Sequence, residues 1–237
     1  MRFKGLTYII PFVPTLAVSS PSEGLIPFRY QGEVFQTYYK IFGEINEHKL
    51  DSTPLIVAHG GPGLTHDYLL PFADIAINGA SPVILYDQIG NGKSTHVDKK
   101  PTSFWSIDLF VSELVNLIDY FQIHYSFSLV GHSWGGILAS EFAVQKQPEG
   151  LKRLVLTDSL ASSELWEKSN MQLMKEFPED VQEGLLAGMS DPPRYAAALS
   201  VYYAVHGCRV VPLPEEYVYS LSAVFGPHGD TTVASTK

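Results

Sequence analysis

The 237-residue sequence lacks several features that would place it in particular classes of protein. It has one cysteine, Cys208, so no disulfide can form within the chain. It lacks an excess of positive charge, and its net charge of −9 argues against nucleic acid as a partner. It also lacks an apolar run of the ~18 residues that a membrane span requires. No repeat or low-complexity tract occurs, and a hydrophobic content of 45% fits one globular domain.

The first 20 residues combine a positive start with a short apolar run. Arg2 and Lys4 precede the run, and small residues follow at Ala17 and Ser19, as in a secretory signal. Two prolines interrupt the run, and the sequence contains no acceptor site for N-glycosylation. We therefore expect either an N-terminal extension or a signal peptide at 1–20, with a cytoplasmic location slightly favoured over secretion.

A candidate catalytic serine lies in residues 126–136, which read SFSLVGHSWGG. This stretch contains G-x-S-x-G, preceded by residues of strand composition and followed by residues of helix composition. A strand, a sharp turn and a helix around a serine are the context of a nucleophile elbow. In such a turn Ser133 would have a strained backbone, and the helix N-terminus behind it would favour developing negative charge. The alternative interpretation is a glycine-rich turn with an incidental serine.

A second motif supplies what acyl transfer at a serine would need. Residues 54–58 form a short apolar segment of strand type, and His-Gly-Gly-Pro-Gly follows at 59–63. The reaction needs two backbone N–H donors aimed at the oxyanion, one from the residue after the nucleophile and one from a glycine-rich loop. The predicted donors are Trp134 and either Gly60 or Gly61.

Four stretches together resemble one family. They are HGGPG at 59–63, YDQIGNGKS at 86–94, GHSWGG at 131–136 and HGCR at 206–209. They are similar to motifs of the proline iminopeptidases, serine aminopeptidases of the α/β-hydrolase fold, and in particular of the fungal branch. The resemblance implies a mostly parallel sheet with helices on both faces and a helical cap after the sixth strand. It also implies a small peptide, an amino-acid amide or another small molecule as the substrate.

Hydrophobic periodicity predicts the elements of a core at 21–158. The strongest helix is expected at 103–120, where apolar residues recur at three- and four-residue steps. Strands alternating with helices predict a parallel sheet with right-handed crossovers. Besides the strand before Ser133, the expected strands are an antiparallel pair within 28–42, then 55–58, 83–86 and 154–157.

No cofactor is expected. Gly92, Lys93 and Ser94 have the order that ends a phosphate-binding loop. That motif needs a glycine five residues before Gly92, and position 87 is Asp.

From residue 159 to 225 the strand pattern stops, and prolines separate several helical segments. The resemblance implies that this region is the cap above Ser133. Within it, Glu215 and Glu216 could bind the α-ammonium group of a substrate. They could equally be solvated residues at a helix start, where acidic side chains are favourable.

The sequence contains no identifiable general base. In this fold the triad order is serine, acid, histidine, but only a tail without strand pattern, 226–237, follows the cap. The histidines after Ser133 are His206, which resembles a structural part of the family's cap, and His228, between glycines of the tail. Asp158, at the end of the sixth strand, is the candidate acid. We therefore expect a form truncated before the last strands.

Three functions stay open on these observations. The first is an impaired serine hydrolase that releases N-terminal proline or a small amino acid, or cleaves a small metabolite. The second is a non-catalytic protein that binds a ligand, and the third is an esterase of the same fold. The earlier histidines, His59, His66 and His132, lie in loops that resemble family scaffold. Self-association is expected through the strand at 154–157, because its outer edge would lack a partner.

Overall fold

The computed structural model describes residues 20–45, 53–79, 81–97 and 99–235. The possible signal peptide therefore lies outside the described residues, apart from Ser20. Within the described part, no helix combines the length and the apolar character that crossing a membrane requires.

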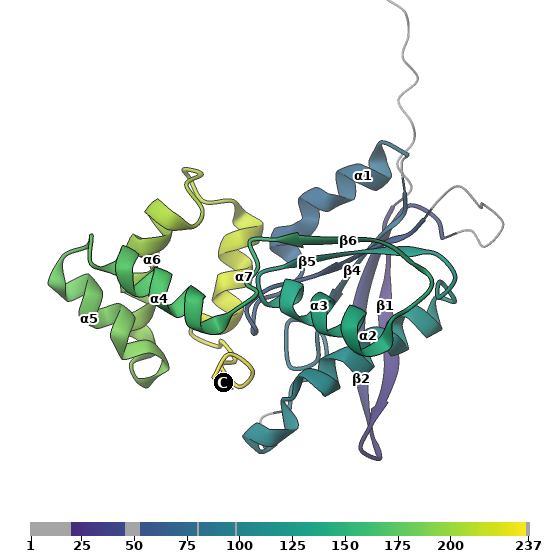
Figure 1. The fold of residues 1–237 in the computed structure, drawn as a ribbon, viewed down its shortest axis with the longest axis horizontal. Coiled ribbons are helices and arrows are strands. Elements are labelled where there is room, and N and C mark those ends of the chain that lie inside the picture. Colours follow the sequence, from purple (N-terminus) through teal and green to yellow (C-terminus); the bar gives the residue numbers. More distant parts are fainter. Residues whose placement is uncertain (1–19, 46–52, 80, 98, 236–237) are drawn as a thin grey trace, which may run out of the picture.

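One six-stranded sheet forms the centre of the fold (Figure 1). Its order is β1-β2-β4-β3-β5-β6, with β1–β2 and β2–β4 antiparallel and the other neighbours parallel. This confirms the predicted α/β-hydrolase architecture, in which an antiparallel pair extends a parallel sheet. The strands are β1 (Ser22–Tyr30), β2 (Glu33–Phe42), β3 (Leu55–Ala58), β4 (Val83–Asp87), β5 (Phe127–His132) and β6 (Leu151–Thr157).

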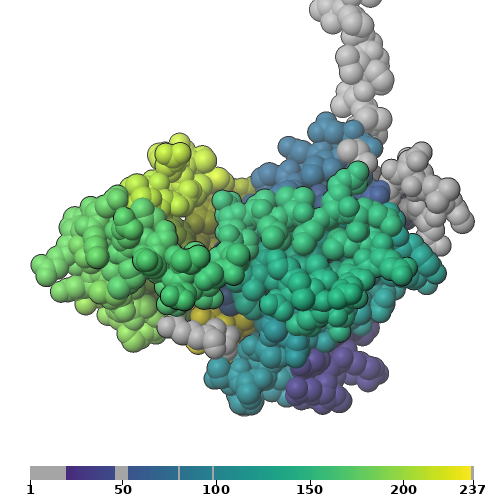
Figure 2. Space-filling view, viewed as in Figure 1, coloured from purple at the N-terminus to yellow at the C-terminus, as the bar shows by residue number. Residues whose placement is uncertain are grey.

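The helices fall into a core set and a cap set. The core set is η1 (Asp67–Ala73), α1 (Asp74–Ile77), η2 (Thr102–Phe104), α2 (Ile107–Tyr120) and α3 (Trp134–Lys146). The cap set is α4 (Ser163–Met174), α5 (Glu179–Ala187), η3 (Gly188–Ser190), α6 (Pro192–His206) and α7 (Glu215–Phe225). The cap helices form a lobe beside the sheet, and α7 is the cap helix that lies against the core (Figures 1 and 2).

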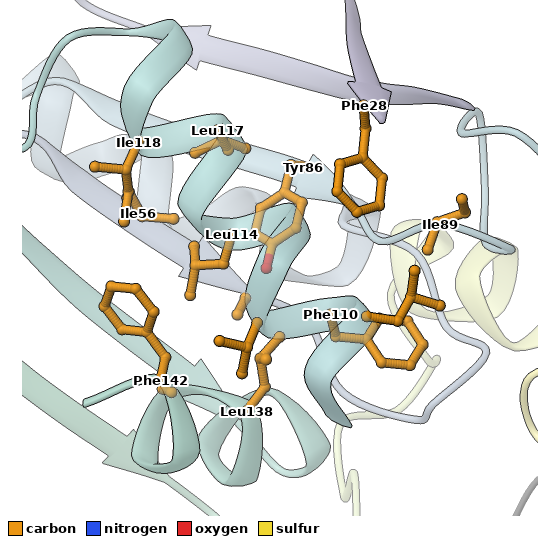
Figure 3. Packing of buried hydrophobic residues seen from close by; sticks show 14 of the residues in the cluster. Phe28, Ile56, Tyr86, Ile89, Phe110, Leu114, Leu117, Ile118, Leu138 and Phe142 are labelled. Atoms are coloured by element: carbon orange, nitrogen blue, oxygen red, sulfur yellow. The ribbon is translucent and has the colours of Figure 1, made fainter. Parts of the chain in front are cut away.

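The main hydrophobic core lies between the sheet and the helices α2 and α3. The alternation of β-strand side chains sends Ile56 and Tyr86 to this face, where they meet Leu114 and Leu138 from the two helices (Figure 3). The opposite face carries a smaller cluster, which packs against η1 and α1. The helix expected at 103–120 begins at Ile107, because the Ser106 side chain caps it by accepting a hydrogen bond from the Leu109 N–H.

The sixth strand differs from its prediction in length. It begins at Leu151 and includes Lys152 and Arg153, whose charges hid the start of the strand from a search for apolar runs. Its apolar composition is typical of a buried parallel strand. As predicted, its outer edge lacks a partner among the described residues: β6 is the edge of the sheet, and Leu156 is 49% exposed.

The residues after α7 form no strand up to Ser235, the last described residue. They return to the core, where Val233 is buried against the main cluster. The tail therefore packs near Gly90 and Trp105, residues of the segment after β4.

Candidate active site

Ser133 occupies a sharp turn between β5 and α3. Its backbone angles are φ 54° and ψ −119°, a strained conformation for a residue with a side chain. The turn closes this tightly because its neighbours are glycines. A β-carbon on Gly131 would lie 2.2 Å from the Gly135 carbonyl oxygen, and one on Gly135 would lie 2.2 Å from that of Ala58. The geometry is that of a nucleophile elbow.

The end of β6 holds the backbone of this turn. The Ser133 N–H donates to the Thr157 carbonyl at 2.9 Å, and the Ser159 hydroxyl donates to the Ser133 carbonyl at 2.9 Å. Both polar groups of the strained peptide are thus satisfied, which stabilises a conformation that would otherwise relax. Among the described residues, the Ser133 hydroxyl itself makes no hydrogen bond and stays available to a ligand.

The HGGPG loop passes directly beside the serine. A β-carbon on Gly60 would lie 3.0 Å from the Ser133 β-carbon, so only glycine allows this approach. The fully buried His59 fixes the start of the loop, because its Nε2 accepts the Gln88 N–H at 3.0 Å. Its Nδ1 therefore carries the proton and donates to the Gly60 carbonyl at 2.9 Å. Burial lowers the pKa of His59, which agrees with this neutral role.

Gln88, in the loop after β4, connects the HGGPG loop to the elbow. Its amide nitrogen donates to the His59 carbonyl at 2.9 Å, and its amide oxygen accepts the Trp134 indole N–H at 2.9 Å. The residue is fully buried. Three segments far apart in the sequence are therefore held in one arrangement around Ser133.

A chain of hydrogen bonds runs from Gly60 through Tyr68 to His132. The Gly60 N–H donates to the Tyr68 hydroxyl at 2.7 Å, and this hydroxyl lies 2.7 Å from His132 Nδ1. This contact engages His132 Nδ1 with either atom as the donor. Burial lowers the pKa of His132. Among the described residues, no hydrogen bond joins His132 to Ser133, so His132 is not in position as the base.

The predicted oxyanion donors differ in their availability. The Gly60 N–H is bonded to Tyr68, which leaves the Gly61 N–H as the donor from the loop. Trp134 is the first residue of α3, so its N–H has no acceptor within the helix. Gly61 and Trp134 stay the predicted pair, since no bound ligand tests them.

Asp158, the candidate acid, follows β6 with a left-handed backbone, φ 47°. Its Oδ2 lies 3.7 Å from His132 Nε2, and its side chain is 86% exposed. An ion pair this exposed is screened by water and orients its histidine weakly. The role of Asp158 in a triad stays a prediction.

The other predicted histidines occupy structural or peripheral positions. His66 is buried and bonded through Nδ1 to Asp87 at 2.8 Å. Burial alone would raise the pKa of Asp87, but the hydrogen bonds and charge of His66 lower it overall. His206 packs on Phe177 and Tyr202 within the cap. His228 is exposed in the tail.

The cap encloses a mostly apolar cavity of about 390 Å³ between α6, residues 208–213 and α7. Tyr217 lines this cavity and also packs edge-on against Tyr68, with ring centroids 6.4 Å apart. Tyr217 thus connects the wall of the cavity to the hydrogen-bond chain beside Ser133. Glu215 and Glu216 are exposed in the first turn of α7 and do not line the cavity. Their binding of an ammonium group stays a prediction.

Metal ligands are not clustered in the described part of the chain, where no three His, Cys, Asp or Glu side chains are arranged to hold an ion. The residues that the sequence failed to indicate are Tyr68 and Ser220, whose hydroxyl accepts the Thr65 N–H at 2.9 Å. Each acts through a contact between distant segments, so no local pattern could have revealed it, whereas Gln88 lies within the YDQIGNGKS motif.

Comparison with known proteins agrees with this geometry. The family model described as the alpha/beta hydrolase fold matches residues 53–188, more than half of the chain. The fold and the elbow are therefore those of an α/β hydrolase.

The relatives identify the family more narrowly. The crystal structure of proline iminopeptidase from Mycobacterium smegmatis is 33% identical, with a TM-score of 0.71, covering 91% of this chain and 74% of that one. The crystal structure of VinJ is 36% identical, with a TM-score of 0.80, covering 90% and 70%. The chain belongs to the proline iminopeptidase family, as the motifs predicted; membership of a fungal branch stays a prediction.

Curated sequences agree but are longer than this chain. Proline iminopeptidase from Lactobacillus delbrueckii subsp. lactis is 36% identical over 189 residues, which are 76% of this chain and 62% of the relative. The enzyme from Clostridioides difficile is 39% identical over 168 residues, 70% of this chain and 53% of the relative. The chain thus spans about six tenths or less of the length of these relatives.

Proposed function

We propose that the protein is a serine hydrolase of the aminopeptidase type, with Ser133 as the nucleophile. The observation that carries the proposal is the strained elbow conformation of Ser133, beside a glycine loop that brings a second backbone donor within reach. In this reaction the Ser133 oxygen attacks a carbonyl carbon, and the oxyanion accepts hydrogen bonds from Gly61 and Trp134. The carbon–nitrogen bond breaks as the acyl-enzyme forms, and the leaving amine takes up the proton that the Ser133 hydroxyl loses, carried by solvent. Water then adds to the acyl-enzyme, which releases the acid and restores the Ser133 hydroxyl.

The substrate class follows from the family. Relatives are named proline iminopeptidases, so the first substrates to test carry an N-terminal prolyl group or a small amino acid. The apolar cavity in the cap supports a compact, largely apolar acyl group or leaving group next to the site. Other small amides and esters are compatible with the same chemistry.

Turnover is expected to be slow. Among the described residues, no histidine is hydrogen bonded to Ser133, and Nδ1 of the adjacent His132 is engaged by Tyr68. A serine without a base is a weak nucleophile, and oxyanion stabilisation with binding leaves only about 10³–10⁴-fold acceleration over water. The same observation favours a second candidate function, in which the protein binds its ligand at this site without turnover.

The test is hydrolysis of prolyl-4-nitroanilide, alanyl-4-nitroanilide and 4-nitrophenyl acetate by the wild type and by Ser133→Ala. We expect turnover below about 1 s⁻¹, a value at the low end for working enzymes, and its loss in the variant. Activity that survives Ser133→Ala would contradict the nucleophile. Stoichiometric binding of the prolyl compound without hydrolysis would select the second candidate.

A further inference from the structure

The HGGPG loop is attached to the cap as well as to the core. The buried Thr65, two residues after the motif, donates its backbone N–H to the Ser220 hydroxyl of α7 at 2.9 Å. The Ser220 hydroxyl also lies 3.2 Å from the Thr65 hydroxyl and 3.3 Å from the Thr65 carbonyl oxygen, to which it can donate. One serine side chain therefore contacts both backbone polar groups of Thr65, across 155 residues of sequence.

Two further residues of α7 touch the same loop. Tyr217 packs against Tyr68, whose hydroxyl accepts the Gly60 N–H. A β-carbon on Gly63 would lie 3.1 Å from Val224 Cγ2 and 3.0 Å from the Ala234 β-carbon, so both α7 and the tail pack closely against the loop here. Positions 217, 220 and 224 share one face of the helix, since they are three and four residues apart. This face of α7 lies against the end of the sheet where the elbow is found (Figure 1).

The two predicted oxyanion donors thus depend on different parts of the fold. Trp134 belongs to α3 and is fixed by the elbow, whereas Gly61 belongs to a loop that α7 holds in place. We infer that Ser220 is a positioning residue, through which the cap helix α7 sets the place of the Gly61 N–H relative to Ser133. The inference rests on the proposed hydrolase function. It adds a role for the cap in building the oxyanion site.

Removing the hydroxyl should displace the loop. Ser220→Ala leaves the buried Thr65 N–H without an acceptor, and the loop then moves to satisfy it. Because a displacement of about 1 Å can cost roughly 100-fold in rate, we expect labelling of Ser133 by a fluorophosphonate to slow by about 10- to 100-fold. Ser220→Ala should lower the maximal rate of labelling. The probe concentration that gives half of this maximal rate should not change.

Two further variants separate positioning from folding. Ser220→Thr keeps the hydroxyl and should restore most of the rate, and Val218→Ala, on the exposed side of the same helix, should label as the wild type does. A second readout, amide hydrogen exchange of the 59–66 segment, should show faster exchange in Ser220→Ala alone. All measurements are made well below the melting temperature of each variant, with circular dichroism as the check on folding.

Two results would overturn the inference. One is a folded Ser220→Ala that labels at the wild-type rate with unchanged exchange of the loop. The other is a folded Ser220→Thr as slow as Ser220→Ala, which would assign the effect to packing. If the wild type is not labelled at Ser133 at all, the proposed function fails. The exchange of residues 59–66 then still decides whether Ser220 holds the loop.

Discussion

The described residues surround Ser133 with buried, hydrogen-bonded side chains on one side and with exposed ones on the other. On the side of β3 and β4, His59 and Gln88 are fully buried and hydrogen bonded to the HGGPG loop and the elbow. On the side of β6, the strand is an exposed edge, and the Asp158 side chain that follows it lies mostly in solvent. The first side can hold the oxygen of an acyl group, whereas the described residues of the second side provide no base.

This difference separates the two tasks that acyl transfer at Ser133 would require. The proposed oxyanion donors lie near β3 and β5, beside buried contacts among β3, β4 and α7. Activation of the nucleophile would require a histidine held by an acid, and the triad order of this fold places both after the serine.

The largest expected effect is a loss of stability on substitution of Gly135, where the elbow packs directly against β3 and the HGGPG loop. Gly135→Ala would place a β-carbon 2.2 Å from the Ala58 carbonyl oxygen and 2.7 Å from that of His59. Because these are backbone atoms of β3 and its loop, the elbow must open, at a cost of about 3 kcal/mol or more in the free energy of unfolding. Urea denaturation measures this, with Glu141→Ala on the exposed side of α3 as the control. A wild-type free energy of unfolding in Gly135→Ala would show that the elbow is loose.

The second largest expected effect is a pH dependence of the free energy of unfolding, which comes from a residue on the β3 and β4 side of Ser133. The buried Glu113 accepts hydrogen bonds from Thr37 and from the Ile89 N–H, next to Gln88. Burial nevertheless raises the pKa of Glu113 to about 8. The folded protein keeps a proton that the unfolded chain releases above its ordinary pKa of 4.5, so this stabilisation is complete below about 4.5 and is lost as the pH rises toward 8.

The measurement is the free energy of unfolding at about pH 5.5 and about pH 7.5 for the wild type and Glu113→Gln. We expect the wild type to lose up to about 1.4 kcal/mol per pH unit through this residue, and the variant to lose less. Equal slopes in both proteins would mean that Glu113 does not keep its proton on folding.

A smaller effect, on self-association, is expected from substitution in the edge strand β6. The edge strand β6 exposes Leu154, Val155 and Leu156, and such an edge pairs readily with another chain. We expect self-association of the purified 237-residue chain, reduced by Val155→Lys, because a charge on an edge strand discourages pairing. Size-exclusion chromatography with light scattering gives the molar mass. A wild type that is monomeric at all concentrations tested would contradict the expectation.

The smallest effect is expected from Asp158→Asn. An exposed ion pair contributes at most about 1 kcal/mol, so labelling of Ser133 by a fluorophosphonate should change by less than about fivefold. Loss of more than tenfold would instead make Asp158 a working partner of His132. That result would mean that the side of β6 also contributes to activation of Ser133.

The sequence predicted those parts of the molecule that local patterns encode. The G-x-S-x-G motif between a strand and a helix placed Ser133, and apolar periodicity placed α2 and most strands. Long-range pairs left no such pattern: Tyr68 meets His132 across 64 residues, and Ser220 meets Thr65 across 155. The start of β6 at Leu151 was missed as well, because Lys152 and Arg153 interrupt the apolar pattern.

The role of Ser133 as nucleophile is tested most directly by identifying the residue that a fluorophosphonate labels. The wild type is incubated with the probe, digested and analysed by mass spectrometry, beside Ser133→Ala as the control. We predict a single labelled peptide with the adduct on Ser133, formed slowly because no described base activates it, and no adduct in the variant. Labelling at another residue, or labelling that persists in Ser133→Ala, would contradict the assignment.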